Sequence, residues 1–194
     1  MTDITCDYRD CDSADIGPLI QAINMLGENL VGLELGVDKG ESSLTILHNC
    51  SIEKLYLIDN WKPYDDWLKT KPDGKPAYSV NRMDIELCEF LTRLKVKYSG
   101  MSDNVEIIKK DSLDAVKSIP DFSLDFIFFD AMMTKEQSYN EAHAYYPKIK
   151  KGGFFMGHDA NAIEQVMKPI VSIKQYYNNK NKIHRYLNTF LFKI

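Results

Sequence analysis

Residues 30–40 read LVGLELGVDKG. A short, mostly apolar run ends at Gly36, and residues 41–47 then follow a helical pattern. Glycine lets a chain turn sharply at the end of a strand, and it lets the backbone approach a ligand that a Cβ atom would exclude. The stretch therefore predicts a strand, a tight turn and a helix.

The same unit recurs along the chain. A leading helix is predicted from Leu19 to Leu26. Further strands are predicted at 54–59, 105–111, 124–130 and 151–158, and further helices at 79–98, 113–119, 137–149 and 162–177. The strand at 124–130 is so apolar that both of its faces must be buried. Strands that alternate with helices in this way predict a parallel sheet with helices on both faces.

The C-terminal end departs from this alternation. Two β-rich stretches, 183–187 and 190–194, are separated only by Asn188 and Thr189. Strands joined by so short a connection must be antiparallel. The expected fold class is α/β, a Rossmann-like, seven-stranded, mostly parallel sheet with helices on both faces and an antiparallel C-terminal strand.

The length of 194 residues fits one domain, residues 1–194, because a chain of this size buries a single core. Residues 1–29 form an N-terminal segment with the leading helix. The stretch 61–78 is rich in Lys, Pro and Asp and is long for a connection, so it is predicted to be a lid or substrate loop.

Composition excludes several classes of protein. The net charge of -4 argues against a nucleic-acid partner, which usually requires a strongly basic surface. The four cysteines contain no C-x-x-C pair, so neither a zinc site nor a disulfide framework is expected. The sequence shows no signal peptide and no run of about 18 apolar residues, so no membrane partner is expected and the predicted location is cytoplasmic.

Acidic residues gather where the predicted strands end: Glu34, Asp59, Asp111, Asp130 and the pair His158-Asp159. Ligands of open α/β sheets bind outside the carboxyl ends of the strands. A glycine turn alone can be a tight connection without a ligand. Asp59, however, follows Gly36 by 23 residues, at the next strand end, where a carboxylate can accept both hydroxyls of a ribose. Together the turn and Asp59 favour a nucleoside ligand.

These residues resemble a known family. The pattern E-x-G-x-x-x-G from Glu34 to Gly40, the acid Asp59, the pair Asp111-Ser112 and the stretch 124–130 resemble the successive motifs of class I S-adenosylmethionine-dependent methyltransferases, over roughly residues 30–194. The resemblance implies S-adenosylmethionine as cofactor. Glu34, Gly36 and Gly40 would lie against its methionine part, Asp59 would hold the ribose, and Asp111 and Ser112 would lie near the adenine. Trp61 either covers the adenine or the substrate, or is ordinary packing.

A closer resemblance is to metal-dependent O-methyltransferases of the macrocin and catechol type, through residues 124–130 and 151–159. It implies Asp130, His158 and Asp159 as metal ligands, Asp130 also as a cofactor neighbour, and Asp130 and His158 as catalytic residues. The metal would be Mg²⁺ or another divalent ion, and a histidine nitrogen suits a transition metal better than Mg²⁺. Met132 and Met133 stand where such enzymes usually carry a proton acceptor, so metal-assisted and metal-free sites both remain open.

The expected function is methyl transfer from S-adenosylmethionine to a small-molecule acceptor, at a hydroxyl group. The alternative is a non-catalytic S-adenosylmethionine-binding or regulatory protein of the same fold. A nicotinamide dehydrogenase is disfavoured because the turn lacks G-x-G-x-x-G. Methylation of nucleic-acid amino groups is disfavoured because Asp-Pro-Pro does not follow the strand at 124–130. The resemblance also suggests a homo-oligomer.

Overall fold

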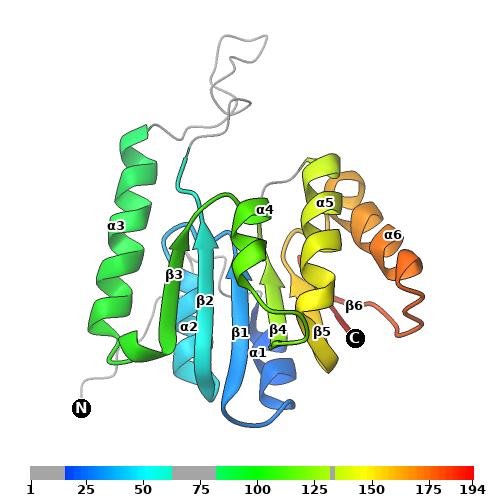
Figure 1. The fold of residues 1–194 in the computed structure, drawn as a ribbon, viewed down its shortest axis with the longest axis horizontal. Helices are drawn as coiled ribbons and strands as arrows, with labels where there is room; N and C mark the ends of the chain where they lie inside the picture. The colour runs from blue at the N-terminus through cyan, green and yellow to red at the C-terminus, as the bar shows by residue number, and fades with distance from the viewer. Residues whose placement is uncertain (1–15, 63–81, 132–133) are drawn as a thin grey trace.

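A seven-stranded sheet forms the centre of the protein. The computed structural model describes residues 16–62, 82–131 and 134–194. Within these ranges the strands lie in the order β3-β2-β1-β4-β5-β7-β6 (Figure 1). Their bounds are β1 Leu30–Leu35, β2 Ile52–Asp59, β3 Val105–Lys109, β4 Leu124–Phe129, β5 Ile149–Gly157, β6 His184–Tyr186 and β7 Thr189–Lys193. Strands β1 to β5 pair in parallel, whereas β7 is antiparallel to β5 and β6. The predicted sheet is confirmed.

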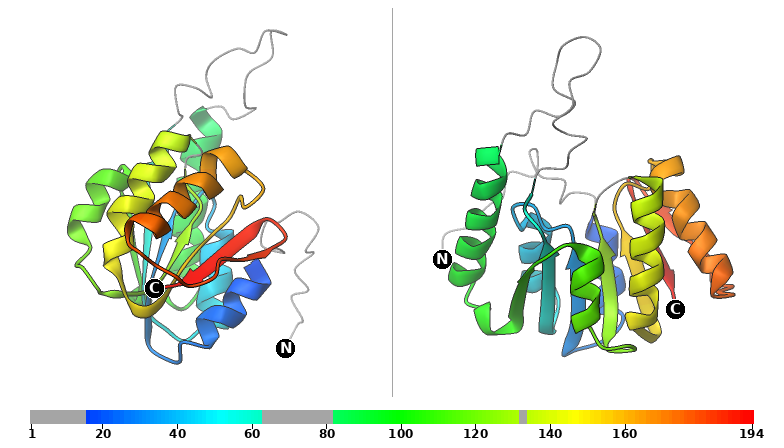
Figure 2. Two further views of the ribbon diagram at one scale, coloured as in Figure 1. Left: turned by 90° about the vertical axis from the view of Figure 1, so that its right-hand side faces the viewer. Right: turned by 45° about the horizontal axis from the view of Figure 1, so that its top comes forward.

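Helices cover both faces of the sheet, as predicted (Figures 1 and 2). One core cluster contains residues of α1 (Gly17–Asn24), α2 (Glu41–Asn49) and α3 (Arg82–Tyr98). The other contains residues of α4 (Ser112–Ala115), α5 (Lys135–Tyr145) and α6 (Lys168–Tyr176). The sheet therefore separates two hydrophobic cores.

Strand β4 is buried on both faces. Phe126 and Phe128 belong to the first core, whereas Ile127 and Phe129 belong to the second. Gly32 on the neighbouring β1 makes room for the Phe126 ring, because a Cβ atom there would lie 2.1 Å from it. The apolar run from 124 to 129 thus forms the central strand that its sequence predicts.

Three predicted helices are shortened or interrupted in the structure, in each case near a proline. The helix predicted at 137–149 stops at Tyr145, a 3₁₀ turn containing Pro147 follows, and β5 begins at Ile149. The helix predicted at 113–119 is one α turn, a 3₁₀ turn and then extended backbone before Pro120. The helix predicted at 162–177 splits into a π-helical turn, Ile163–Met167, and α6, which contains Pro169. Proline lacks the N–H that a regular helix uses and disfavours helix in the preceding residue.

The predicted lid or substrate loop lies almost wholly outside the described residues, as do Met132 and Met133 and most of the N-terminal segment. Among the residues that the structure describes, no helix is both long and apolar enough to span a membrane.

Candidate active site at the carboxyl ends of the strands

Backbone hydrogen bonds just beyond the strands hold neighbouring strand ends together. They join β1 to β2, β4 to β1, and β5 to β4: Gly36 N to Ile58 O (2.9 Å), Asp130 N to Leu35 O (2.8 Å), and His158 N to Phe129 O (3.0 Å). The sheet order also reverses between β1 and β4, which makes this edge a topological switch point. The residues predicted to form the site are therefore gathered along one edge of the sheet.

The turn after β1 requires glycine at two positions. Gly36 has φ +84°, and a Cβ atom there would lie 2.0 Å from the carbonyl oxygen of Asp130. Gly40, with φ +75°, precedes the first residue of α2. Side chains at such φ values are strained, and at Gly36 the neighbouring strand end also leaves no room. The glycine pattern therefore lets the β1 turn lie directly against Asp130.

Asp59 ties this turn to the end of β2. Its Oδ2 accepts hydrogen bonds from the backbone N–H groups of Val37 (2.8 Å) and Asp38 (3.1 Å), and its Oδ1 accepts one from Trp61 N (2.8 Å). Burial raises the pKa of this carboxyl group above its ordinary value, although the three N–H groups oppose that shift. The structure thus places Asp59 beside the glycine turn, and its predicted contact with a ribose stays a prediction.

Glu34 lies inside the protein rather than at the open edge. Its carboxyl group is fully buried and accepts hydrogen bonds from the hydroxyls of Ser42 and Ser43 at the start of α2. Burial raises its pKa to about 8. The expectation that every strand presents its acid at the open edge is therefore wrong for β1, because this side chain faces α2. Its predicted contact with the cofactor stays a prediction.

Trp61 packs beneath the glycine turn. The residue is only 6% exposed, and its indole N–H donates a hydrogen bond to the carbonyl oxygen of Asp38 (2.9 Å). The hydroxyl of Thr92 on α3 donates to the same oxygen (2.9 Å). Of the two interpretations of Trp61, this geometry is that of a packing residue, and a role as a cover for the adenine or substrate stays a prediction.

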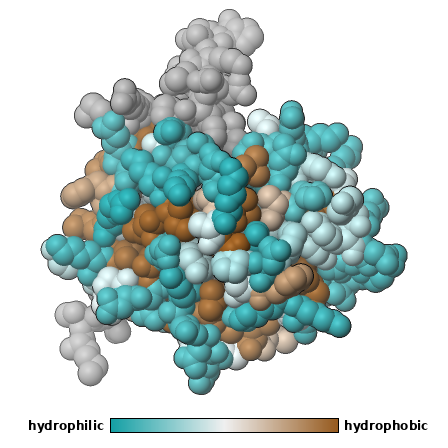
Figure 3. All heavy atoms as spheres, viewed as in Figure 1, coloured by the Kyte–Doolittle hydropathy of each residue, from teal (hydrophilic) through white to brown (hydrophobic). Residues whose placement is uncertain are grey.

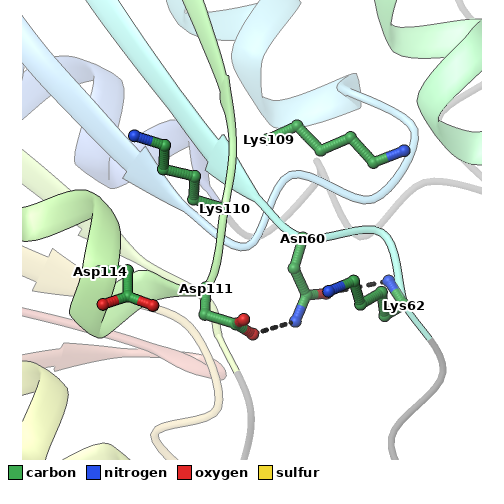
Figure 4. Close-up of a pocket in the computed structure, with 6 residues that line it drawn as sticks. All are labelled: Asn60, Lys62, Lys109, Lys110, Asp111 and Asp114. Atoms are coloured by element: carbon green, nitrogen blue, oxygen red, sulfur yellow. Dashed lines mark hydrogen bonds between the residues drawn. The ribbon is translucent and has the colours of Figure 1, made fainter.

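A pocket of about 550 Å³ opens where β2 and β3 end (Figure 4). Asn60 crosses it and donates a hydrogen bond from Nδ2 to Oδ1 of Asp111 (2.7 Å). The residues that line the pocket are Asn60, Lys62, Lys109, Lys110, Asp111 and Asp114. The pocket therefore contains Asp111, one of the two residues predicted to lie near the adenine.

Ser112, the other predicted adenine neighbour, is held by α5. Its hydroxyl donates a hydrogen bond to Glu141 and accepts one from Gln137 Nε2 (3.3 Å), while its carbonyl oxygen accepts one from the Tyr145 hydroxyl (2.7 Å). Burial raises the pKa of Glu141 to about 7. The sequence interpretation did not single out these three α5 residues, although their spacing of four places them on one helical face.

Asp130, His158 and Asp159 form a compact cluster beyond β4 and β5. Each offers one ligand atom, and these atoms lie within 4.8 Å of one another. Nδ1 of His158 lies 3.7 Å from Oδ1 of Asp130 and 3.4 Å from Oδ1 of Asp159. The nearby imidazole lowers the pKa of the Asp159 carboxyl group. The structure thus brings the three predicted metal ligands together, and two carboxylates with one imidazole are a donor set that suits a divalent transition metal.

Residues 33–160 match the family model described as "Methyltransferase domain". The chain belongs to this methyltransferase family. The match covers more than half of the chain and includes the glycine turn, Asp59, Asp111 and the cluster at 130 and 158–159. It confirms the class I S-adenosylmethionine-dependent methyltransferase predicted from the motifs, and it identifies the protein as an enzyme.

Solved structures share the fold of this methyltransferase at low sequence identity. The O-methyltransferase NovP is 14% identical with a TM-score of 0.66, over 93% of this chain and 78% of NovP. The O-methyltransferase from Bacillus cereus, solved in complex with S-adenosylhomocysteine, is 15% identical with a TM-score of 0.62, over 95% and 82% of the two chains. The precorrin 8w decarboxylase of Methanobacterium thermoautotrophicum is 15% identical with a TM-score of 0.59, over 91% and 88%. Identities this low show the fold alone. No curated protein matches the sequence.

The methyltransferase carries one further polar contact, at the cluster of Asp130, His158 and Asp159, that sequence did not reveal. Asn188, in the turn between β6 and β7, donates a hydrogen bond from Nδ2 to Oδ1 of Asp159 (3.0 Å). Its Oδ1 accepts from Asn161 N (2.9 Å), and its carbonyl oxygen accepts from Ala160 N (2.8 Å). The antiparallel hairpin therefore fixes the loop that follows β5, and it orients one carboxylate of the cluster.

Proposed function

We propose that this methyltransferase transfers the methyl group of S-adenosylmethionine to a hydroxyl oxygen of a small-molecule acceptor, with a divalent metal held by Asp130, His158 and Asp159. The observation that supports the proposal most is the position of this cluster. Its three ligand atoms lie within 4.8 Å of one another, and the backbone of Asp130 lies against the Gly36 turn.

The order of the strands supports one direction for the bound cofactor. Asp111 follows β3, Asp59 ends β2, Gly36 follows β1 and Asp130 follows β4, so they succeed one another along the edge of the sheet. We place the adenine in the pocket that contains Asp111, the ribose at Asp59 and the methionine part at Gly36. The reactive sulfonium then faces Asp130, which is where the cluster lies.

A metal ion bound by these residues would hold the acceptor oxygen and lower the pKa of its hydroxyl group. The acceptor would then lose its hydroxyl proton to solvent water, its oxygen would form a bond to the methyl carbon of S-adenosylmethionine, and the carbon–sulfur bond would break to release S-adenosylhomocysteine. In the metal-free version, His158 accepts the proton, because carboxylates at 3.4 and 3.7 Å stabilise the protonated imidazole. Both versions require the acceptor hydroxyl at this cluster.

Turnover tests the proposed reaction. Purified protein is incubated with S-adenosylmethionine and sets of phenols, catechols and sugars, with Mg²⁺, with Mn²⁺ or with EDTA, and S-adenosylhomocysteine is measured. We expect product that depends on the acceptor and on the metal, and a loss of at least about a hundredfold in Asp130→Asn. Turnover that survives EDTA but not His158→Ala would instead support the metal-free version. Binding of S-adenosylmethionine without turnover of any acceptor would support the non-catalytic alternative.

Metal binding is measured separately from activity. Mn²⁺ is titrated into the protein and followed by electron paramagnetic resonance. The wild type should bind one ion, and Asp159→Ala should weaken binding about 10–100-fold. Asp103→Ala, an exposed carboxylate in the turn before β3, is the matched control and should bind like the wild type. Equal binding in all three proteins would exclude the cluster as a metal site.

A further inference from the structure

The outward face of α3 is apolar. Its inner face carries buried residues such as Ile85, Cys88 and Val96. The opposite face carries four large apolar or aromatic side chains, Leu87 (51% exposed), Phe90 (58%), Leu94 (37%) and Tyr98 (74%). We call these four residues the α3 stripe. A surface helix normally turns charged and polar residues outward, so a second apolar face calls for a partner.

The α3 stripe is a patch rather than scattered exposure. Its members are three or four residues apart and therefore follow one line along the helix. The described residues include twelve large hydrophobic side chains that are exposed, and four of them belong to this one helix. Hydrophobic spheres lie at the left-hand edge of the space-filling view, where Figure 1 draws α3 (Figure 3). Contiguous patches of this kind mark interaction sites.

The position of α3 leaves its stripe accessible. Strand β3 is the last strand on this side of the sheet, and α3 lies along the same side of the molecule (Figures 1 and 2). A partner can therefore approach the stripe without displacing another described helix.

The charges beside the stripe identify the partner. Glu86 and Lys97 are both exposed and are eleven residues apart. Eleven residues make about three helical turns, so both side chains lie on the same flank of the stripe. The midpoint between them lies level with position 92 along the helix, to within about half a residue. The pairs Leu87–Tyr98 and Phe90–Leu94 are centred at the same level, again to within about half a residue.

A twofold axis at this midpoint makes the surface complementary to itself. Two copies of α3 that pack antiparallel across the axis bring Leu87 opposite Tyr98 and Phe90 opposite Leu94. The same operation keeps each flank on its own side, so Glu86 of each copy lies beside Lys97 of the other. Closed twofold symmetry is the commonest arrangement of protein dimers, and charges that flank an apolar seam set the orientation of paired helices.

We propose that the α3 stripe is a homodimer interface, in which α3 packs antiparallel against α3 of a second copy and two Glu86–Lys97 ion pairs lie at the two ends of one flank. This surface lies outside the proposed active site and does not depend on the acceptor or the metal.

Sedimentation of the full chain tests the interface. The monomer mass is 22.3 kDa, and the wild type should sediment with twice that mass at about 100 μM, a concentration that favours even a modest interface. Phe90→Glu and Leu94→Glu should each weaken the dimer at least about a hundredfold, since both bury a charge in the seam. Val171→Glu, an exposed apolar position on α6 (39% exposed), is the matched control and should stay dimeric.

Charge exchange tests the antiparallel register. Glu86→Lys and Lys97→Glu should each weaken the dimer about tenfold, because each places like charges together in both ion pairs. The double exchange restores opposite charges and should restore the dimer. Circular dichroism and binding of S-adenosylhomocysteine show that each variant is folded. A monomeric wild type would overturn the proposal and leave the stripe to a different partner. A dimer that survives Phe90→Glu, or a double exchange no tighter than the single ones, would overturn it as well.

Discussion

Among single residues, Asp59 combines a structural role with an expected role in cofactor binding. It accepts three backbone N–H groups from the turn and from Trp61, and we expect it to accept the ribose hydroxyls. Asp59→Ala should weaken binding of S-adenosylhomocysteine at least about tenfold and lower the free energy of unfolding by about 1–3 kcal/mol. Calorimetric titration and urea unfolding measure the two effects. Glu53→Ala, an exposed acid on the same strand, is the control, and an Asp59→Ala protein with unchanged affinity would place the ribose elsewhere.

We expect Asn188 to orient Asp159, a proposed metal ligand. Its side-chain amide donates to Oδ1 of Asp159, and such partners of a metal ligand typically contribute about 10–100-fold to metal affinity. Asn188→Ala should therefore weaken Mn²⁺ binding by that factor, as read by paramagnetic resonance. Asn49→Ala, at the end of α2, removes a comparable amide bond to Thr45 and should leave the affinity unchanged. Equal affinities in the two variants would argue against a positioning role for Asn188.

Glu141 makes stability depend on pH. Its pKa is raised from 4.5 to about 7 by burial, so the fold favours the protonated form. Unfolding at pH between those values releases a proton, and the free energy of unfolding should fall as pH rises from about 4.5 to 7. In Glu141→Gln, the fall in the free energy of unfolding over this pH range should be smaller by about 1–3 kcal/mol. Urea unfolding at pH 5, 6 and 7 measures it, and an identical slope in both proteins would show that Glu141 titrates normally.

At the scale of elements, the turn between β1 and α2 is the most constrained. A Cβ atom on Gly36 would meet the backbone of Asp130 at 2.0 Å, whereas Gly100 has a similar φ of +76° and open space where a Cβ atom would lie. Gly100→Ala should cost about 1–2 kcal/mol through backbone strain alone. Gly36→Ala adds the clash and should cost at least about 3 kcal/mol. Equal unfolding midpoints in urea would mean that the β1 turn can yield.

Element type was easier to predict from the sequence than element ends. Strand-like runs ending near glycine or acidic residues indicated the five parallel strands, and central strands such as β4 are near-continuously apolar because both of their faces are buried. The two C-terminal strands were indicated by β-rich stretches joined by a short connection, although β6 itself is exposed. The helix ends depended on local backbone chemistry. Pro147 ends α5 early, and Pro169 accompanies a π-helical turn before α6. A helical pattern of apolar residues does not report such breaks.

At the scale of the whole molecule, the sequence indicated residues that follow strands better than residues that support them. Asp59, Asp111, Asp130 and His158 follow or end parallel strands, so topology alone gathers them at one edge. Asn188 and Glu141 join the site through tertiary packing of the hairpin and of α5, and neither follows a parallel strand, so strand topology does not indicate them. Glu34 ends up buried because its side chain faces α2, and a strand pattern does not specify which acid faces a helix.

We expect the edge formed by β3, β2, β1 and β4 to bind S-adenosylmethionine. Calorimetric titration of the purified protein with S-adenosylhomocysteine, and with NAD as the comparison ligand, measures this binding. We predict one site per chain for S-adenosylhomocysteine, with a Kd between about 1 μM and 1 mM, and no measurable binding of NAD. Binding of NAD without binding of S-adenosylhomocysteine would show that this edge holds a different nucleotide.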